Sequence, residues 1–198
     1  MRRPVDSARV RLFMRELGAA AGAETNLFFT GGVTAVLLGW RTSTLDIDIK
    51  MEPEEDRLLR AIPRLKESLE INLELASPGD FIPELPGWRE RSVSIGRQGR
   101  ITFYHYDFAA QALAKIERGH AQDMGDVREM LVRGLIDAKD LLARLGEIEP
   151  HLYRYPAIDP PSFRRAVERT AAAAPPLRGD AGAPRHPAQR KPGDRDPT

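Results

Sequence analysis

The feature that most constrains this chain is a short run of alternating acidic and apolar residues, Asp46-Ile47-Asp48-Ile49. Because successive side chains of a β-strand point to opposite faces, the alternation predicts a strand whose two carboxylates share one face, about 6–7 Å apart. Ile47 and Ile49 are expected to bury the other face. Carboxylates held side by side repel each other, which favours a bound cation or a catalytic role. The pattern alone is equally compatible with a half-exposed strand whose acids are solvated.

A pair of glycines, Gly31-Gly32, precedes these acids, with thirteen residues between Gly32 and Asp46. It follows the apolar run Leu27–Phe29, which predicts a strand, and precedes residues 33–39, whose Val, Ala and Leu content predicts a short helix. Glycines at such a turn let the backbone approach a ligand closely, and a helix start presents free amide groups to an anion. Divalent cations held by carboxylates bridge phosphate oxygens and neutralise their charge. The two motifs together predict a phosphate site beside a metal site, as a nucleoside triphosphate requires.

Composition narrows the class of protein. The 198 residues are enough for one domain with a sizeable core, or for one domain with a small appendage. A net charge of +1 with 30% charged residues does not indicate the strongly basic surface of a nucleic-acid-binding domain. The chain has no cysteine, which excludes disulfides and thiolate metal sites, and it has no apolar run long enough to span a membrane. We therefore predict a cytoplasmic protein that does not enter a membrane.

Hydrophobic periodicity predicts an α/β (α+β) fold, in which a small mixed sheet carries helices on one face and is followed by a helical C-terminal half. Strands are predicted at residues 27–29, 44–51, 70–75, 92–95 and 101–106. Helices are predicted at residues 4–21, 33–39, 53–69, 108–118, 123–133, 137–146 and 160–170. We accordingly divide the chain into an α/β core (1–107), a helical part packed on it (108–174), and a tail rich in Pro, Gly, Arg and Asp that is predicted to be disordered (175–198).

The order of these motifs resembles that of the nucleotidyltransferase superfamily, which has the fold of polymerase beta. The signature of that superfamily is an apolar residue before Gly-Gly or Gly-Ser and, after a short helix, an Asp-apolar-Asp-apolar strand. Here Thr30, which is less apolar than usual, precedes Gly31-Gly32, and the run 46–49 supplies the strand. The resemblance extends over residues 25–130. It implies the mixed sheet with flanking helices that the periodicity also predicts.

Two further groups of residues resemble the AbiEii-type toxin branch of the superfamily and related uncharacterised bacterial families. The first group lies just before the acids and consists of Gly39, Arg41 and Ser43. The second is the Lys-Ile-Glu-Arg run that begins at Lys115 and is followed by two aspartates. It is similar to the Lys-bearing and Asp-bearing helices of that branch.

The resemblance implies roles for individual residues. Gly31 and Gly32 would hold a triphosphate, and Asp46 and Asp48 would bind two Mg²⁺ ions. The superfamily places a third carboxylate on a following strand, where it shares a metal and assists deprotonation of the acceptor. Glu74 is our candidate for this third acid, and a solvated strand residue is the alternative. The remaining candidate nucleotide-binding residues are Arg41, Ser43 and Lys115.

Several candidates also have structural interpretations. Lys115 is equally compatible with a triphosphate contact and with a surface ion pair to an acid such as Asp123. Arg41 is compatible with a phosphate contact, with capping of a carboxylate cluster, or with an ordinary surface position. Trp88, Tyr104 and Tyr106 are expected to pack in the core rather than to form a wall for base stacking.

The predicted activity is Mg²⁺-dependent transfer of a nucleoside monophosphate from a nucleoside triphosphate to a hydroxyl acceptor, with release of pyrophosphate. The expected acceptor is an RNA, a protein or a small molecule, and the AbiEii resemblance adds a toxin–antitoxin setting with a partner antitoxin or toxin. The alternatives are a catalytically degenerate nucleotidyltransferase fold that acts as a binding or regulatory module, and a plain metal-binding protein. The position of Glu74 relative to Asp46 and Asp48 distinguishes the enzyme from the degenerate module.

Overall fold

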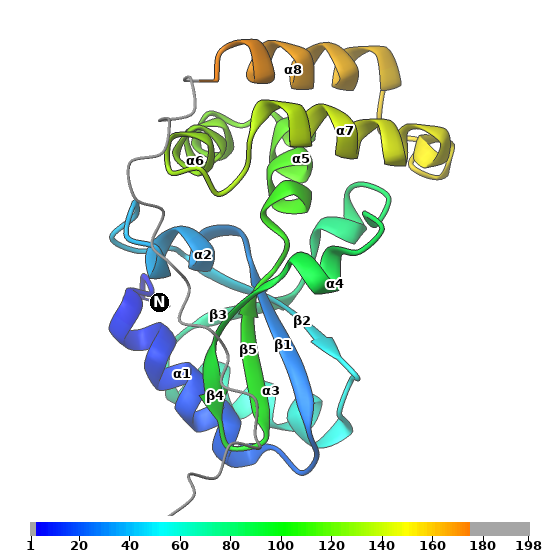
Figure 1. Cartoon of the computed structure of the whole chain (residues 1–198). Helices are drawn as coiled ribbons and strands as arrows, with labels where there is room; N and C mark the ends of the chain where they lie inside the picture. Colours follow the sequence, from blue (N-terminus) through cyan, green and yellow to red (C-terminus); the bar gives the residue numbers. More distant parts are fainter. Residues whose placement is uncertain (1–2, 175–198) are drawn as a thin grey trace, which may run out of the picture.

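A five-stranded mixed sheet forms the centre of the N-terminal half in the computed structural model, which describes residues 3–174 (Figure 1). Its strand order is β3-β2-β1-β5-β4, and the strands span Thr25–Thr30 (β1), Asp46–Glu52 (β2), Asn72–Leu75 (β3), Val93–Gln98 (β4) and Ile101–His105 (β5). β1 is antiparallel to β2 and parallel to β5. β2 is parallel to β3, and β4 and β5 form an antiparallel hairpin. The predicted small mixed sheet is therefore confirmed.

Eight α-helices lie within residues 3–174 and span Ser7–Ala20 (α1), Gly31–Leu37 (α2), Asp56–Ser68 (α3), Trp88–Arg91 (α4), Phe108–Arg118 (α5), Ala121–Val132 (α6), Ala138–Ile148 (α7) and Pro160–Ala172 (α8). Two 3₁₀-helices are Pro78–Asp80 (η1) and Glu149–Arg154 (η2). Four α-helices are preceded by an aspartate whose side chain accepts a backbone N–H of the first turn, namely Asp6, Asp107, Asp137 and Asp159. Every helix predicted from periodicity is present.

Several boundaries differ from those predicted. α2 begins at Gly31 itself, so that the glycine pair is the first turn of the helix rather than the residues before it. α3 begins at Asp56, later than predicted, because β2 stays extended as far as Glu52. β3 begins at Asn72 because Glu70 takes a left-handed conformation, with φ of 50°, at the turn after α3.

One hydrophobic core lies between the sheet and helices α1 and α3. Ile47 and Ile49 of β2 are fully buried in it. The ring of Phe29 on β1 lies 6.2 Å from that of Phe13 on α1, measured between centroids. The intervening residues of β2 therefore point to the opposite face of the sheet, as the period of two predicts.

A second core covers part of that opposite face. Phe28 of β1 packs against Trp88 of α4 at 4.9 Å and against Tyr104 of β5 at 5.1 Å between ring centroids. Trp88 in turn stacks on Tyr106 at 4.2 Å, and both residues are 1% exposed, which confirms that they pack in the core. The prediction that helices cover one face only is wrong, because the aromatic side chains on β1 and β5 require a cover, and α4 supplies it.

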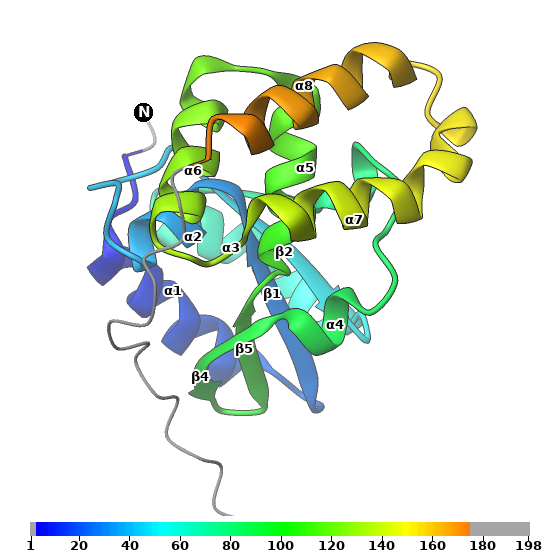
Figure 2. The same cartoon turned by 45° about the horizontal axis from the view of Figure 1, so that its top comes forward.

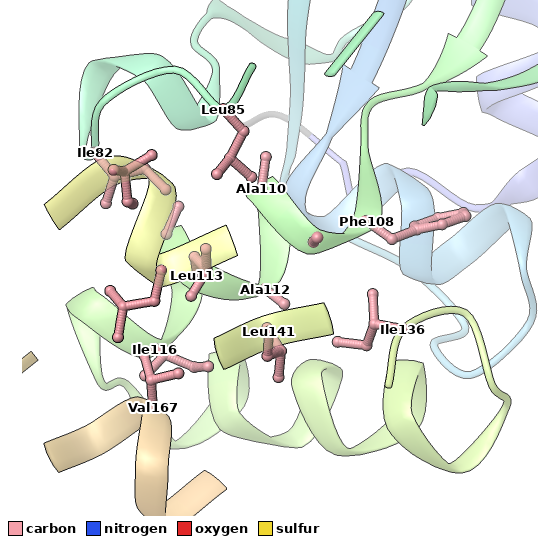
Figure 3. Close-up of a cluster of buried hydrophobic side chains, with 14 of the residues drawn as sticks. Ile82, Leu85, Phe108, Ala110, Ala112, Leu113, Ile116, Ile136, Leu141 and Val167 are labelled. Atoms are coloured by element: carbon pink, nitrogen blue, oxygen red, sulfur yellow. The ribbon is translucent and has the colours of Figure 1, made fainter. Parts of the chain in front are cut away.

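The second core continues into the helical C-terminal half. Figure 2 shows the helices of this half, α5 to α8, beyond the end of the sheet. Helix α5 runs from the end of the sheet into contact with α6, α7 and α8. Figure 3 shows Leu113 and Ile116 of α5, Leu141 of α7 and Val167 of α8 within this cluster. No helix within the described part of the chain is both long and apolar enough to cross a membrane. The predicted disordered tail, 175–198, lies outside the described residues.

Candidate active site

Three carboxylates share one face of two neighbouring strands. In the parallel pair of β2 and β3, Asp48 lies opposite Glu74, and Asp46 lies opposite Asn72. Directly paired residues of neighbouring strands point to the same face, so Glu74 is on the side of Asp46 and Asp48. Leu73, between Asn72 and Glu74, is 3% exposed on the opposite face. We call Asp46, Asp48 and Glu74 the carboxylate face.

The amide of Asn72 joins two members of the carboxylate face. Its Nδ2 donates to Asp46 Oδ1 at 2.6 Å and to Glu74 Oε1 at 3.0 Å. Sequence reasoning missed this contact, although the strict alternation of residues 70–75 puts Asn72 on the same face as Glu74. Among the residues that the structure describes, no three acidic or histidine side chains already converge as ligands of one metal ion. The three acids share one face and one cavity, and the Asn72 amide connects Asp46 and Glu74 by hydrogen bonds.

The glycine pair lies directly against this face. Gly31 has φ of +60°, and a Cβ built on it would lie 2.6 Å from Asp48 Oδ2. A Cβ on Gly32 would lie 2.1 Å from Thr44 Oγ1, at the approach to β2. Real Cβ atoms do not tolerate such distances, and L-residues rarely adopt a positive φ. The two glycines therefore let the start of α2 close on β2, and Gly31 brings its backbone to the Asp48 carboxylate.

The electrostatic environment of Asp48 is unusual for an aspartate. Burial, and then the charges of Asp46 and Glu74, raise its pKa from 3.8 to about 6, while Arg118 and Lys115 oppose the rise. Negative charge is therefore concentrated in a poorly solvated site, and the positive charges of Arg118 and Lys115 only partly offset it. A group with these properties is suited to bind a divalent cation or to accept a proton near neutral pH.

A cavity of about 190 Å³ opens in front of the carboxylates. Its wall includes five of the residues singled out from the sequence, which are Gly31, Asp46, Asp48, Glu74 and Lys115. It also includes residues to which sequence reasoning gave no role in the site, among them Phe81, Gln111 and Arg118. Arg118 had a signal, because it lies one turn after Lys115 on the same helix, α5. The loop residue Phe81 had none.

Lys115 is buried in an ion-pair network rather than exposed. It is 3% exposed, and its Nζ donates to Asp123 Oδ1 at 2.8 Å and to Asp126 Oδ2 at 2.7 Å. Arg118 donates to the same Asp123 oxygen at 2.9 Å. Burial raises the pKa of Asp123, but the hydrogen bond and charge of Lys115 and the charge of Arg118 outweigh it, so that the pKa lies below its usual value. Of the two interpretations of Lys115, the ion pair with an acid is present, but the lysine is buried rather than at the surface.

Arg41 belongs to the same network. Its Nε and Nη2 donate to the two carboxylate oxygens of Asp126 at 2.8 and 2.6 Å, and its side chain is 16% exposed. Of the three interpretations of Arg41, capping of a carboxylate describes this contact. Ser43 is half-buried in the turn before β2. The ion-pair network, as we use the term below, consists of Arg41, Lys115, Arg118, Asp123 and Asp126.

Comparison with known proteins identifies the family. Residues 11–157, about three quarters of the chain, match the family described as "Nucleotidyltransferase of unknown function (DUF6036)". The chain belongs to this nucleotidyltransferase family. The match covers the sheet, both glycines, the carboxylate face and the ion-pair network, and it confirms the resemblance to the nucleotidyltransferase superfamily. No curated protein and no solved structure matches this nucleotidyltransferase.

Proposed function

We propose that this protein transfers a nucleoside monophosphate from a nucleoside triphosphate to a hydroxyl acceptor and depends on Mg²⁺. One observation carries the proposal above the others. Asp48 and Glu74 lie opposite each other on β2 and β3, with Asp46 on the same face and the backbone of Gly31 against Asp48. A phosphate-binding turn beside clustered carboxylates is the arrangement that phosphoryl transfer requires.

The carboxylate face has the right chemistry for magnesium. Mg²⁺ prefers oxygen ligands and binds through one or two carboxylates together with substrate phosphates. The pKa of Asp48, raised to about 6 by burial and by its acidic neighbours, means that a cation would relieve the repulsion within the face. Asp46, Asp48 and Glu74 would hold Mg²⁺, with two ions in a two-metal site. Bound there, the metal would neutralise the charge of the triphosphate and of the leaving pyrophosphate.

The remaining groups of the cavity have roles that follow from their charge and position. The ion-pair network contains three cationic and two acidic side chains, so its net charge is +1. Lys115 and Arg118 line the cavity and would attract the triphosphate. The acceptor oxygen forms a bond to the α-phosphorus as the bond to pyrophosphate breaks, and a carboxylate of the face takes the acceptor proton.

The acceptor is proposed from the sequence resemblance. A hydroxyl of an RNA, of a protein or of a small molecule is compatible with the reaction. The AbiEii resemblance supports an RNA or protein acceptor, and with it a toxin–antitoxin setting with a partner antitoxin or toxin.

A label-transfer assay tests the proposed activity. The protein is incubated with Mg²⁺, each of the four α-³²P-labelled nucleoside triphosphates in turn, and total RNA, total protein or a small-molecule extract. Transfer is expected with the wild type and not with Asp46→Ala/Asp48→Ala. The matched control is Glu54→Ala, which removes an exposed acid just beyond the end of β2 and should transfer normally. Absence of both transfer and Mg²⁺-dependent nucleotide binding in the wild type would overturn the proposal.

The second candidate function is a nucleotide-binding module without transferase activity. The contact that favours it is made by the Asn72 amide, which donates a hydrogen bond to one oxygen of Asp46 and to one oxygen of Glu74 and so occupies two oxygens that would otherwise bind a metal. Glu74 is also exposed to solvent. Mg²⁺-dependent binding of nucleoside triphosphate by the wild type, without label transfer to any acceptor, would support this module over the enzyme.

A further inference from the structure

An exposed aromatic ring stands at the charged cavity. Phe81 lines the same cavity as Asp46, Asp48 and Glu74, and it is 38% exposed. Leaving a phenyl ring in water forgoes the gain from burying its apolar surface. Phe81 follows directly on η1, which shares the loop with fully buried apolar residues such as Ile82. The ring is therefore exposed on a segment whose neighbours are packed.

The turn that carries Phe81 is held from several sides. Asp80 Oδ2 accepts from the backbone N–H of Ser77 at 2.7 Å, which closes η1 as a capping box. The hydroxyl of Tyr155 donates to the backbone oxygen of Gly79 at 2.8 Å. The backbone N–H of Phe81 itself donates to the carbonyl oxygen of Pro78 at 3.0 Å. These contacts fix the backbone that leads to Phe81, so that the residue is presented in a defined position.

A cationic group lies over the ring. The guanidinium carbon of Arg118 is 5.0 Å from the centroid of Phe81, within the range of a cation–π contact. Arg118 is itself fixed by its hydrogen bond to Asp123 at 2.9 Å. Guanidinium planes and aromatic rings are the two kinds of side chain on which nucleobases stack. Both kinds meet at the wall of this cavity.

The size of the cavity decides which part of a nucleotide would reach Phe81. Its volume of about 190 Å³ lies below the 300–1,000 Å³ of pockets that enclose a whole small-molecule ligand. The carboxylates, Gly31 and the cationic side chains of Lys115 and Arg118 provide groups for a metal-bound triphosphate. The nucleoside must then extend beyond the charged part of the cavity.

We propose that Phe81, together with Arg118, is the platform on which the nucleobase of the bound nucleoside triphosphate stacks. The proposal rests on the proposed function, because it assumes that the carboxylate face receives a triphosphate. Every nucleobase offers a π-face, so a platform of this kind tolerates any base. Phe81 thus adds affinity for the nucleoside without selecting one of the four nucleotides.

Paired binding measurements separate the base from the phosphates. Isothermal titration calorimetry in the presence of Mg²⁺ gives Kd for ATP and for inorganic tripolyphosphate, which has no base. In Phe81→Leu, Kd for ATP should rise about tenfold, the lower part of the range for loss of one base–aromatic stack. Kd for tripolyphosphate should stay within about twofold of wild type, because its contacts are electrostatic. Phe81→Tyr, which keeps the ring, should bind both ligands as the wild type does.

The chain offers a matched control. Tyr153 is another exposed aromatic residue, at 72%, with the guanidinium of Arg154 at 5.4 Å from its ring centroid. It is not among the residues that line the cavity. Tyr153→Leu should therefore leave Kd for both ligands unchanged.

The outcomes distinguish failure of the platform from failure of the proposed function. Equal weakening of ATP and tripolyphosphate in Phe81→Leu, or no weakening of either, would overturn the platform and leave the triphosphate site standing. Equal affinity of the wild type for ATP and tripolyphosphate would do the same, because the base would then contribute nothing. If the wild type binds neither ligand, the proposed function fails and the platform fails with it.

Discussion

The carboxylate face and the ion-pair network are built in opposite ways, although Lys115 and Arg118 of the network line the same cavity as the face. The face gathers three acids, and a neutral amide, that of Asn72, joins two of them. In the network each acid receives at least two cationic donors, with Lys115 bridging Asp123 and Asp126. The face is left with excess negative charge, whereas each acid of the network is neutralised by cations within the fold.

Two aspartates make the difference concrete. Asp48 and Asp123 both lose hydration on folding, and burial alone raises the pKa of each. Acidic neighbours add to the rise at Asp48, whereas Lys115 and Arg118 reverse it at Asp123. Burial of an acid therefore does not by itself indicate its role. The charges around it determine whether its ionised form stabilises the fold or favours binding of a cation. We infer that the face serves chemistry and that the network serves structure and charge.

The largest expected effect is on catalysis and follows from changing the face. Asp48→Asn keeps the size of the side chain but removes a charged oxygen ligand. Label transfer should fall by at least about 10³-fold, equivalent to about 4 kcal/mol, with the circular dichroism spectrum unchanged. Transfer within about tenfold of the wild type would show that Asp48 does not take part in the reaction.

The next effect is on stability and follows from changing the network. Asp126→Ala leaves Arg41 and Lys115 largely buried without a principal acceptor. Removing one partner of a buried ion pair costs about 3–5 kcal/mol, to be measured from urea unfolding. The control is Glu129→Ala, which breaks the exposed pair with Arg133, at 40% and 41% exposure, and should cost less than about 1 kcal/mol. Similar losses in the two variants would contradict a structural role for the network.

A smaller effect is the pH dependence of the free energy of unfolding, which has opposite signs for an acid of the face and an acid of the network. Because the pKa of Asp48 is about 6 in the folded protein and 3.8 otherwise, ionising it costs stability as pH rises through this interval. Asp48→Asn should therefore stabilise the metal-free protein by up to about 2–3 kcal/mol above pH 7, and the gain should vanish below about pH 4. The comparison is made by chemical unfolding in EDTA across this pH range. A gain that does not change with pH would show that burial and repulsion do not act on Asp48.

Asp123 provides the opposite case for the same measurement. Its pKa is lowered, so its ionised form stabilises the fold at neutral pH, and this contribution is lost as pH falls through the lowered pKa. Asp123→Asn should therefore destabilise the protein at pH 7, and the difference from wild type should shrink in acid. The same sign in both variants would remove the distinction between the face and the network.

The sequence predicts the face far better than the network, for a physical reason. The face depends mainly on local alternation, since a period of two puts Asp46 and Asp48 on one side of β2. The register of β3 against β2, which pairs Glu74 with Asp48, then adds the third acid. The network depends on contacts between distant segments. The bond from Arg41 to Asp126, for example, joins residues 85 positions apart, and only the packing of α6 against the turn after α2 brings them together.

The same reasoning explains the other differences from prediction. The surface ion pair, one of the two interpretations of Lys115, assumed the exposed position that lysine usually has. Lys115 is instead buried, on a helix that packs against α6, α7 and α8. Phe81 lies in a Pro- and Gly-rich stretch that predicts a loop. Its position at the cavity depends on η1 and on the distant contact from Tyr155. Local sequence patterns therefore predict the positions of the acids, whereas the cations and aromatic rings near them depend on tertiary packing.

The smallest expected effect tests whether the glycine turn and the face are in contact as the structure has them. Gly31 and Gly134 both have positive φ, at +60° and +67°, but a Cβ on Gly134 meets nothing within 4 Å. Gly134→Ala should cost about 1 kcal/mol from its backbone alone. Gly31→Ala should cost about 1 kcal/mol more, because its Cβ displaces the Asp48 carboxylate. In an Asp48→Ala background the extra cost should disappear, which a double-mutant cycle by urea unfolding measures directly. An extra cost that persists without the carboxylate would mean that Gly31 is required by α2 alone, and the link between the turn and the face would be lost.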